Sequence, residues 1–313
     1  MGDARTAALT LREGVPADYD GAAPPGWRRS REDGSGMSMR TVPSSRGVDV
    51  ALHDLGGDGE PLFIGHATGF HGRMYAPLAA GLRERFHVWA LDFRGHGSSS
   101  APDDGDFSWQ GMADDLLNGM AAVGAERAYA VGHSMGGGAV LLAEHGRPGS
   151  IIAAYTYEPI VMSAEFIARR GENPMSGPAR RRREVFASRE EVMWRYAGRP
   201  PLNLLRADAL SLYVQHGFID LPDGTVQLAC RAETEARTFE AEDKLTIELV
   251  GSVSMPVVVG VGRADGGVGP SQITAPLAAA LPNGHLLEYP HLGHFGPFQA
   301  PEQVAADILA AFA

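Results

Sequence analysis

Short apolar runs alternate with amphipathic stretches along the chain from residue 47 onward. The runs are rich in β-branched, aliphatic and aromatic residues, as buried strands are, and the stretches between them repeat apolar residues at helical spacing. In one stretch the apolar positions are Met112, Leu116, Met120 and Val123. The predicted strands are 47–55, 61–66, 87–93, 127–133, 150–158, 255–262 and 285–290. The predicted helices are 74–86, 109–125, 135–146, 271–282 and 301–312.

This alternation predicts an α/β fold in which a mostly parallel central sheet carries helices on both faces. The core is predicted to comprise residues 41–160 and 251–313. Between them, residues 161–250 change to a polar, arginine-rich and helical pattern, which predicts a helical cap inserted above the sheet. Residues 1–40 are rich in Gly, Pro, Asp and Arg without a sustained period, which predicts a tail or strap.

Composition narrows the possible partners. The net charge is −11 and no basic stripe is present, so we expect no nucleic-acid partner. Cys230 is the single cysteine, which excludes an intrachain disulfide and favours a reducing compartment. No apolar run reaches the roughly 18 residues of a membrane span, and the N-terminus lacks a secretory h-region. We therefore expect a cytoplasmic protein that does not enter a membrane; its oligomeric state stays open.

One serine lies at an abrupt joint between a predicted strand and a predicted helix. Gly132-His133-Ser134-Met135-Gly136 fits the pattern G-x-S-x-G. A serine on such a tight turn adopts strained φ/ψ, and the residues two positions away must lack side chains for the backbones to pass. The turn presents the Ser134 hydroxyl at a helix N-terminus, where backbone N–H groups and the helix dipole favour a developing oxyanion.

From about residue 45 to 313 the chain resembles the α/β-hydrolase superfamily. The resemblance rests on five motifs in the family's order: "GHATGFHG", "LDFRGHGSS", "GHSMGG", "VVVGVGRADGGVGP" and "YPHLGHFGPFQAPEQVAADI". They resemble the oxyanion loop, the loop after the next strand, the nucleophile elbow, the acid loop and the histidine loop.

The resemblance implies a catalytic triad in the chain order nucleophile, acid, histidine. The matching residues are Ser134, Asp265 and His294. Because some members carry the acid after the strand that follows the elbow, Glu158 is the alternative acid. His294 would take the proton of Ser134, and the acid would orient the imidazole.

The same resemblance implies an oxyanion hole made by two backbone amides. The expected donors are Met135 and Thr68, with Phe70 as an alternative donor or pocket wall. Ala67 stands where the family usually has glycine, directly after His66, which we expect to play a structural part. No Walker sequence and no H-E-x-x-H motif is present, so we expect neither a cofactor nor a metal.

These features predict a serine hydrolase that uses water to cleave a small-molecule carboxylic ester, lactone or related acyl compound through an acyl-enzyme. Three alternatives stay open: a C–C bond hydrolase, a perhydrolase or cofactor-free haloperoxidase-like enzyme, and a ligand-binding protein that does not turn over. In the cap, the run from Arg180 to Arg183 is interpreted as a solvated helix face with i,i+4 ion pairs. The competing hypothesis is a basic rim that attracts anionic substrates.

Overall fold

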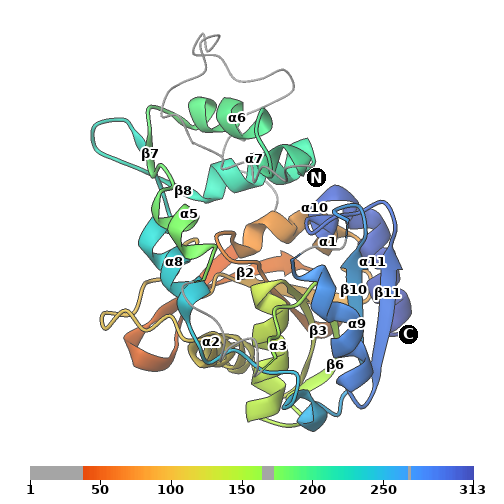
Figure 1. The fold of residues 1–313 in the computed structure, drawn as a ribbon. Helices are drawn as coiled ribbons and strands as arrows, with labels where there is room; N and C mark the ends of the chain where they lie inside the picture. Colours follow the sequence, from red (N-terminus) through yellow and green to blue (C-terminus); the bar gives the residue numbers. More distant parts are fainter. Residues whose placement is uncertain (1–37, 164–172, 267–268) are drawn as a thin grey trace.

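The computed structural model describes residues 38–163, 173–266 and 269–313; the predicted tail over residues 1–37 lies outside the described residues. Eight strands form a central sheet in the order β1-β2-β4-β3-β5-β6-β10-β11 (Figure 1). Strand β2 is antiparallel to β1 and β4, and the pairs from β4 to β11 are parallel. The strands are β1 (Ser38–Pro43), β2 (Asp49–Gly56), β3 (Glu60–Gly65), β4 (Phe86–Leu91), β5 (Ala128–His133), β6 (Ile151–Tyr157), β10 (Val257–Gly262) and β11 (Gly284–Tyr289).

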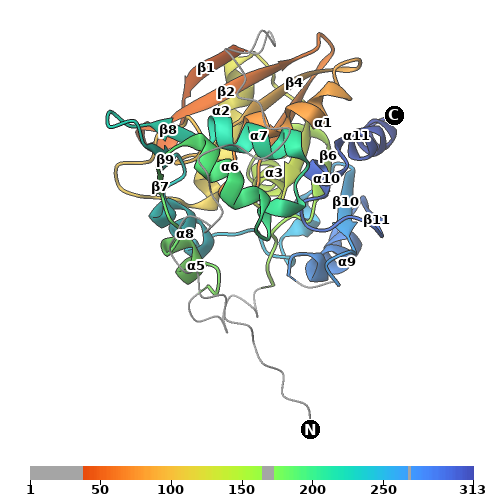
Figure 2. The ribbon, with the colours of Figure 1, turned by 90° about the horizontal axis from the view of Figure 1, so that it is seen from above.

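Helices cover both faces of this sheet, so the predicted fold class is confirmed (Figures 1 and 2). One hydrophobic core joins the sheet to α1 (Ala76–Ala80), α10 (Gly296–Gln299) and α11 (Pro301–Ala311). A second core, on the other face, contains residues of α2 (Trp109–Ala122), α3 (Met135–Gly146) and α9 (Ser271–Ala280). The central strands β3, β4, β5, β6 and β10 are largely buried because helices lie on both sides of them, whereas the edge strand β11 is mostly exposed.

Two predicted boundaries differ from the structure. The helix expected over 74–86 is a 3-10 turn, η2 (Gly72–Tyr75), followed by the short α1, which has proline in its first turn and ends at Gly81. Strand β1 begins at Ser38 inside the segment predicted as a tail, and it pairs along its whole length with β2. Its exposed pattern carries no hydrophobic period, which is why the sequence did not predict it.

The cap lies between β6 and β10. It was expected to be helical, but it also contains strands. Its helices are α5 (Ser176–Arg180), α6 (Arg189–Ala197), α7 (Ala207–His216) and α8 (Ala232–Glu240). A three-stranded sheet in the order β7-β9-β8 accompanies them, made of β7 (Val185–Phe186), β8 (Phe218–Asp220) and β9 (Val226–Leu228). Strands of two or three residues are too short to show a period of two. In Figure 1 α6 and α7 lie above the central sheet.

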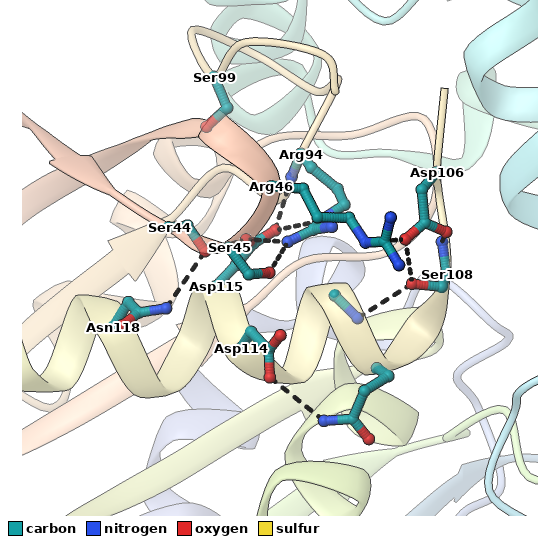
Figure 3. Close-up of polar contacts among 12 residues, drawn as sticks. Ser44, Ser45, Arg46, Arg94, Ser99, Asp106, Ser108, Asp114, Asp115 and Asn118 are labelled. Atoms are coloured by element: carbon teal, nitrogen blue, oxygen red, sulfur yellow. Dashed lines mark hydrogen bonds and ion pairs between the residues drawn. The ribbon is translucent and has the colours of Figure 1, made fainter. Parts of the chain in front are cut away.

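A buried ion pair fastens the loop after β4 to α2 (Figure 3). The Arg94 and Asp115 side chains are both 0% exposed, and Arg94 Nη2 lies 2.8 Å from Asp115 Oδ1. Asp115 Oδ2 also accepts the backbone N–H of Arg94 at 3.0 Å, and the Ser44 hydroxyl donates to Asp115 Oδ1 at 2.6 Å. The motif "LDFRGHGSS" thus braces the loop from within the core.

We expect Asp115→Ala to lower the free energy of unfolding by about 3–5 kcal/mol, because it leaves the buried Arg94 guanidinium without its carboxylate. Urea unfolding followed by circular dichroism measures this loss. The matched control is Asp114→Ala on the same helix, whose carboxylate contacts the exposed Gln110 amide at 3.2 Å. Equal effects of the two substitutions would contradict the importance of the buried pair.

Candidate active site

Ser134 occupies a strained turn between β5 and α3. Its φ of 53° and ψ of −114° lie where residues with side chains are rarely found. Hydrogen bonds on both sides hold this conformation: the Ser134 N–H donates to the Tyr157 carbonyl at 2.9 Å, and the Ile160 N–H donates to the Ser134 carbonyl at 3.0 Å. The loop after β6 therefore fixes the serine, as the G-x-S-x-G pattern predicts for a nucleophile elbow.

The glycines of the motif permit close approach of backbones. A Cβ atom on Gly132 would lie 2.4 Å from the Gly137 Cα. A Cβ atom on Gly136 would lie 2.1 Å from the Gly65 carbonyl oxygen at the end of β3. A side chain at either position would force the first turn of α3 away from β3 and β5.

The imidazole of His294 is bonded to Glu158 and not to Asp265. His294 Nδ1 lies 2.7 Å from Glu158 Oε2, and the Glu158 carboxylate also accepts the Gly262 N–H at 2.9 Å through Oε1. Glu158 is 2% exposed and has a φ of 42°, at the turn directly after β6. The structure thus brings the alternative acid to the histidine.

Asp265 contacts the backbone of the histidine loop instead. Its Oδ2 accepts the backbone N–H of His294 at 2.6 Å. The carboxylate lies against Gly293, where an added Cβ would be 2.4 Å from Asp265 Oδ2. A carboxylate committed to this position holds the loop rather than the ring, so the geometry does not favour the expected pairing of Asp265 with the imidazole.

The histidine loop is fastened to the elbow by neighbouring residues. His133 Nε2 lies 2.8 Å from the His294 carbonyl oxygen, and the rings of the two histidines are 5.1 Å apart. The Tyr157 hydroxyl donates to the Gly293 carbonyl at 2.8 Å. The histidine loop is thereby tied to His133, the residue directly before Ser134, and to the last residue of β6. His285 and His291, the other histidines near this loop in sequence, are exposed.

The loop after β3 is joined to the elbow by a backbone hydrogen bond. The Gly136 N–H donates to the His66 carbonyl at 3.0 Å, which joins this loop to the first turn of α3. Among the described residues, neither the Met135 nor the Thr68 amide donates to a protein acceptor. Free N–H groups at this place can donate hydrogen bonds to a negatively charged oxygen.

His66 is a neutral structural residue. Its Nδ1 lies 2.8 Å from the Ala67 carbonyl, which only accepts, and its Nε2 accepts the Phe93 N–H at 2.9 Å. The proton must therefore be on Nδ1. Burial lowers the pKa of His66 to about 3, so the ring stays uncharged at neutral pH. These contacts brace the loop and leave no nitrogen for proton transfer.

The cap packs directly on the same loop. The Phe70 ring meets the ring of Tyr213 from α7 with centroids 5.4 Å apart. A Cβ atom on Gly69 would lie 2.7 Å from Glu235 Oε1, and the Arg182 guanidinium, which pairs with Glu235, is also adjacent. The loop that carries Thr68 is therefore covered by cap side chains.

The arginine run of the cap is largely neutralised by glutamates. Arg180 pairs with Glu233 and Glu240 of α8, Arg182 pairs with Glu235, and Arg183 pairs with Glu191 of α6. These pairs join different cap elements. The i,i+4 interpretation requires pairs between successive turns of one helix, so it is wrong for these arginines. They also remove most of the positive charge that a basic rim would need.

Within residues 38–163, 173–266 and 269–313, no group of three His, Cys, Asp or Glu side chains is arranged to hold a metal ion. Across the same part of the chain, no helix has the length and apolar character needed to cross a bilayer.

The layered fold and the strained serine turn agree with a single protein family. The model of the alpha/beta hydrolase family matches residues 62–307, so the chain belongs to this family. It is 27% identical over 299 residues to a bifunctional esterase/perhydrolase of Acinetobacter calcoaceticus, covering 87% of this chain and 99% of that protein. A shorter match, 36% identical over 94 residues, is to a fluoroacetate dehalogenase of a Burkholderia species and spans 31% of that protein, about a third.

The solved structure of E-2-(acetamidomethylene)succinate hydrolase shares this fold. It superposes with a TM-score of 0.76 at 20% sequence identity and covers 88% of this chain and 99% of that one. The corresponding curated sequence, 2-(acetamidomethylene)succinate hydrolase of Mesorhizobium japonicum, is 25% identical over 225 residues, which cover 69% of this chain and 76% of that protein.

The buried neutral histidines predict a loss of stability in acid. Burial lowers the pKa of both His66 and His71 from 6.5 to about 3. Below pH 6.5 these two histidines bind protons in the unfolded chain but stay neutral in the folded chain. Their contribution to the free energy of unfolding is therefore full above that pH and is lost as the pH falls toward 3. Each histidine contributes about 1.4 kcal/mol per pH unit in this window.

Urea unfolding between about pH 6 and pH 4 measures this slope. His71→Gln should reduce it by about 1.4 kcal/mol per pH unit. The exposed His285→Gln is the matched control and should leave the slope unchanged. A slope insensitive to His71→Gln would show that this ring is already protonated in the folded protein.

Proposed function

We propose that this protein is a serine hydrolase that cleaves a carboxylic ester, lactone or related acyl compound through Ser134, His294 and Glu158. The observation that carries the proposal is the 2.7 Å contact between His294 Nδ1 and Glu158, in a loop fastened to the strained turn of Ser134. The 27% identity to an esterase/perhydrolase over nearly its whole length supports acyl chemistry.

In this proposal Glu158 sets the tautomer of His294. A carboxylate accepts hydrogen bonds, so Nδ1 carries the proton and Nε2 keeps a lone pair for use as a base. Nε2 removes the hydroxyl proton of Ser134 as its oxygen attacks the acyl carbonyl. Glu158 then stabilises the imidazolium, and its second oxygen stays anchored on the Gly262 N–H.

The Met135 and Thr68 amides donate hydrogen bonds to the negative oxygen of the tetrahedral intermediate. His294 returns the proton to the leaving group, and an acyl-enzyme on Ser134 remains. Water, deprotonated by His294, attacks this ester and releases the acid. The proposed reaction thus requires a small-molecule acyl substrate and water, and every group that moves a proton belongs to the chain.

A second candidate function is perhydrolysis. The observation that favours it is the match to a bifunctional esterase/perhydrolase, which covers 99% of that protein. Hydrogen peroxide would replace water in the second step and release a peroxy acid. Dehalogenation is disfavoured despite the Burkholderia relative, because that chemistry uses a carboxylate at the elbow and this chain has Ser134. C–C bond hydrolysis and ligand binding without turnover are not favoured by any specific contact.

Labelling with a fluorophosphonate tests for an activated serine. We expect one adduct on the wild-type protein and none on Ser134→Ala, read by intact mass, because only a deprotonated serine in an oxyanion site attacks the reagent readily. The exposed Ser98→Ala is the control and should be labelled like the wild type. A well-folded wild type without an adduct would favour ligand binding without turnover.

Paired substitutions of the two acids test which one orients His294. We expect Glu158→Gln to lower kcat/KM for p-nitrophenyl acetate about 10³-fold, because the imidazole loses the carboxylate that sets its tautomer. Asp265→Asn keeps an oxygen for the His294 N–H and should cost about tenfold or less. A larger loss from Asp265→Asn, with unchanged thermal stability, would return the catalytic role to Asp265.

A further inference from the structure

A chain of hydrogen bonds runs through the core beneath the site, from the oxyanion loop to the histidine loop. The Ala67 N–H donates to the Tyr75 hydroxyl oxygen at 3.3 Å, and that oxygen lies 2.8 Å from His133 Nδ1. His133 Nε2 lies 2.8 Å from the His294 carbonyl. The side chains of Ala67, Tyr75 and His133 are at most 3% exposed.

The two end groups of this series of hydrogen bonds, the Ala67 N–H and the His294 carbonyl, fix the direction of every hydrogen bond in it. An amide N–H can only donate and a carbonyl can only accept. The proton of His133 must therefore be on Nε2, where it meets the His294 carbonyl. Nδ1 then offers a lone pair, so the Tyr75 hydroxyl must donate to it and accept from Ala67. One proton arrangement satisfies all four groups.

The surroundings keep His133 neutral. Its ring is boxed by Tyr157, Phe298 and Tyr75, with centroids 5.8, 5.5 and 6.2 Å away. Burial in this apolar box, and next the proximity of His294, hold the pKa of His133 well below its ordinary value. A neutral ring with a fixed tautomer can act as a rigid spacer whose hydrogen bonds do not change with pH.

We propose that Tyr75 and His133 are positioning residues that couple the oxyanion loop to His294 and so set the spacing between the oxyanion amides and the base. The inference rests on the proposed function of the site. No proton moves along these hydrogen bonds during the reaction. His133 holds the His294 carbonyl, while Asp265 holds the His294 N–H and Glu158 holds the ring.

Kinetics of five variants test this coupling: Tyr75→Phe, His133→Leu, the double variant, His133→Gln and Tyr129→Phe. Tyr75→Phe removes the hydroxyl that joins the Ala67 N–H to His133 Nδ1, and His133→Leu removes both hydrogen bonds of the ring. We expect each to lower kcat for p-nitrophenyl acetate about 10–100-fold with little change in KM, because a small displacement of the base affects the transition state far more than binding.

The double variant should be no worse than the poorer single variant, because either substitution already breaks the chain. His133→Gln can donate from its amide nitrogen to the His294 carbonyl, so it should recover most of the kcat lost in His133→Leu. Tyr129→Phe is the matched control: it lies on β5, packs against Phe86 and Phe312, and should behave like the wild type. Independent, multiplying effects of Tyr75→Phe and His133→Leu, or a kcat unaffected by Tyr75→Phe, would overturn the proposal.

Nitrogen-15 NMR of the histidine rings separates this inference from the proposed function. The wild type should show His133 protonated on Nε2, and Tyr75→Phe should shift the Nδ1 resonance because that nitrogen loses its hydrogen-bond donor. If the wild type neither hydrolyses the ester nor takes up fluorophosphonate, the proposed function fails, and the tautomer signals still decide whether the chain of bonds exists. A His133 protonated on Nδ1 in the wild type would refute it directly.

Discussion

The left-handed backbone of Ser134 is the constraint on which the rest of the site depends. A φ of 53° is tolerated there because hydrogen bonds from the loop after β6 hold both sides of the residue and because glycines let α3 approach β3. The same contacts bring the end of β6, and with it Glu158, next to the elbow. The strain of one residue thus organises the nucleophile, the acid and the first turn of α3 together.

His294 is held at three points by three different elements. Asp265, after β10, binds its N–H; His133, at the end of β5, binds its carbonyl; and Glu158, after β6, binds its ring. Loops carry catalytic groups because a rigid scaffold positions them, and here the scaffold reaches the loop on every side. The two carboxylates therefore have separate tasks, one toward the backbone and one toward the imidazole.

The cap contributes packing and neutralised charge over the oxyanion loop. Tyr213 contacts Phe70, and the Arg182–Glu235 pair lies against Gly69. A paired arginine in this position adds little net field, so it supplies little of the attraction for anions that a basic rim would need. The ion pairs between α5, α6 and α8 serve the internal structure of the cap.

The sequence alone determined the α/β fold, the elbow at Ser134 and the candidate base His294, because hydrophobic periods and the spacing of glycines are local properties of a chain. It also left two acids open, and the tertiary structure distinguishes their contacts. Glu158, 136 residues away in sequence, lies 2.7 Å from the imidazole, whereas Asp265, 29 residues away, accepts the backbone N–H of His294. The short cap strands escaped prediction because two or three residues are too few to show a period. The contact of Tyr75 with His133 escaped it because the two residues are 58 positions apart and meet only in the folded protein.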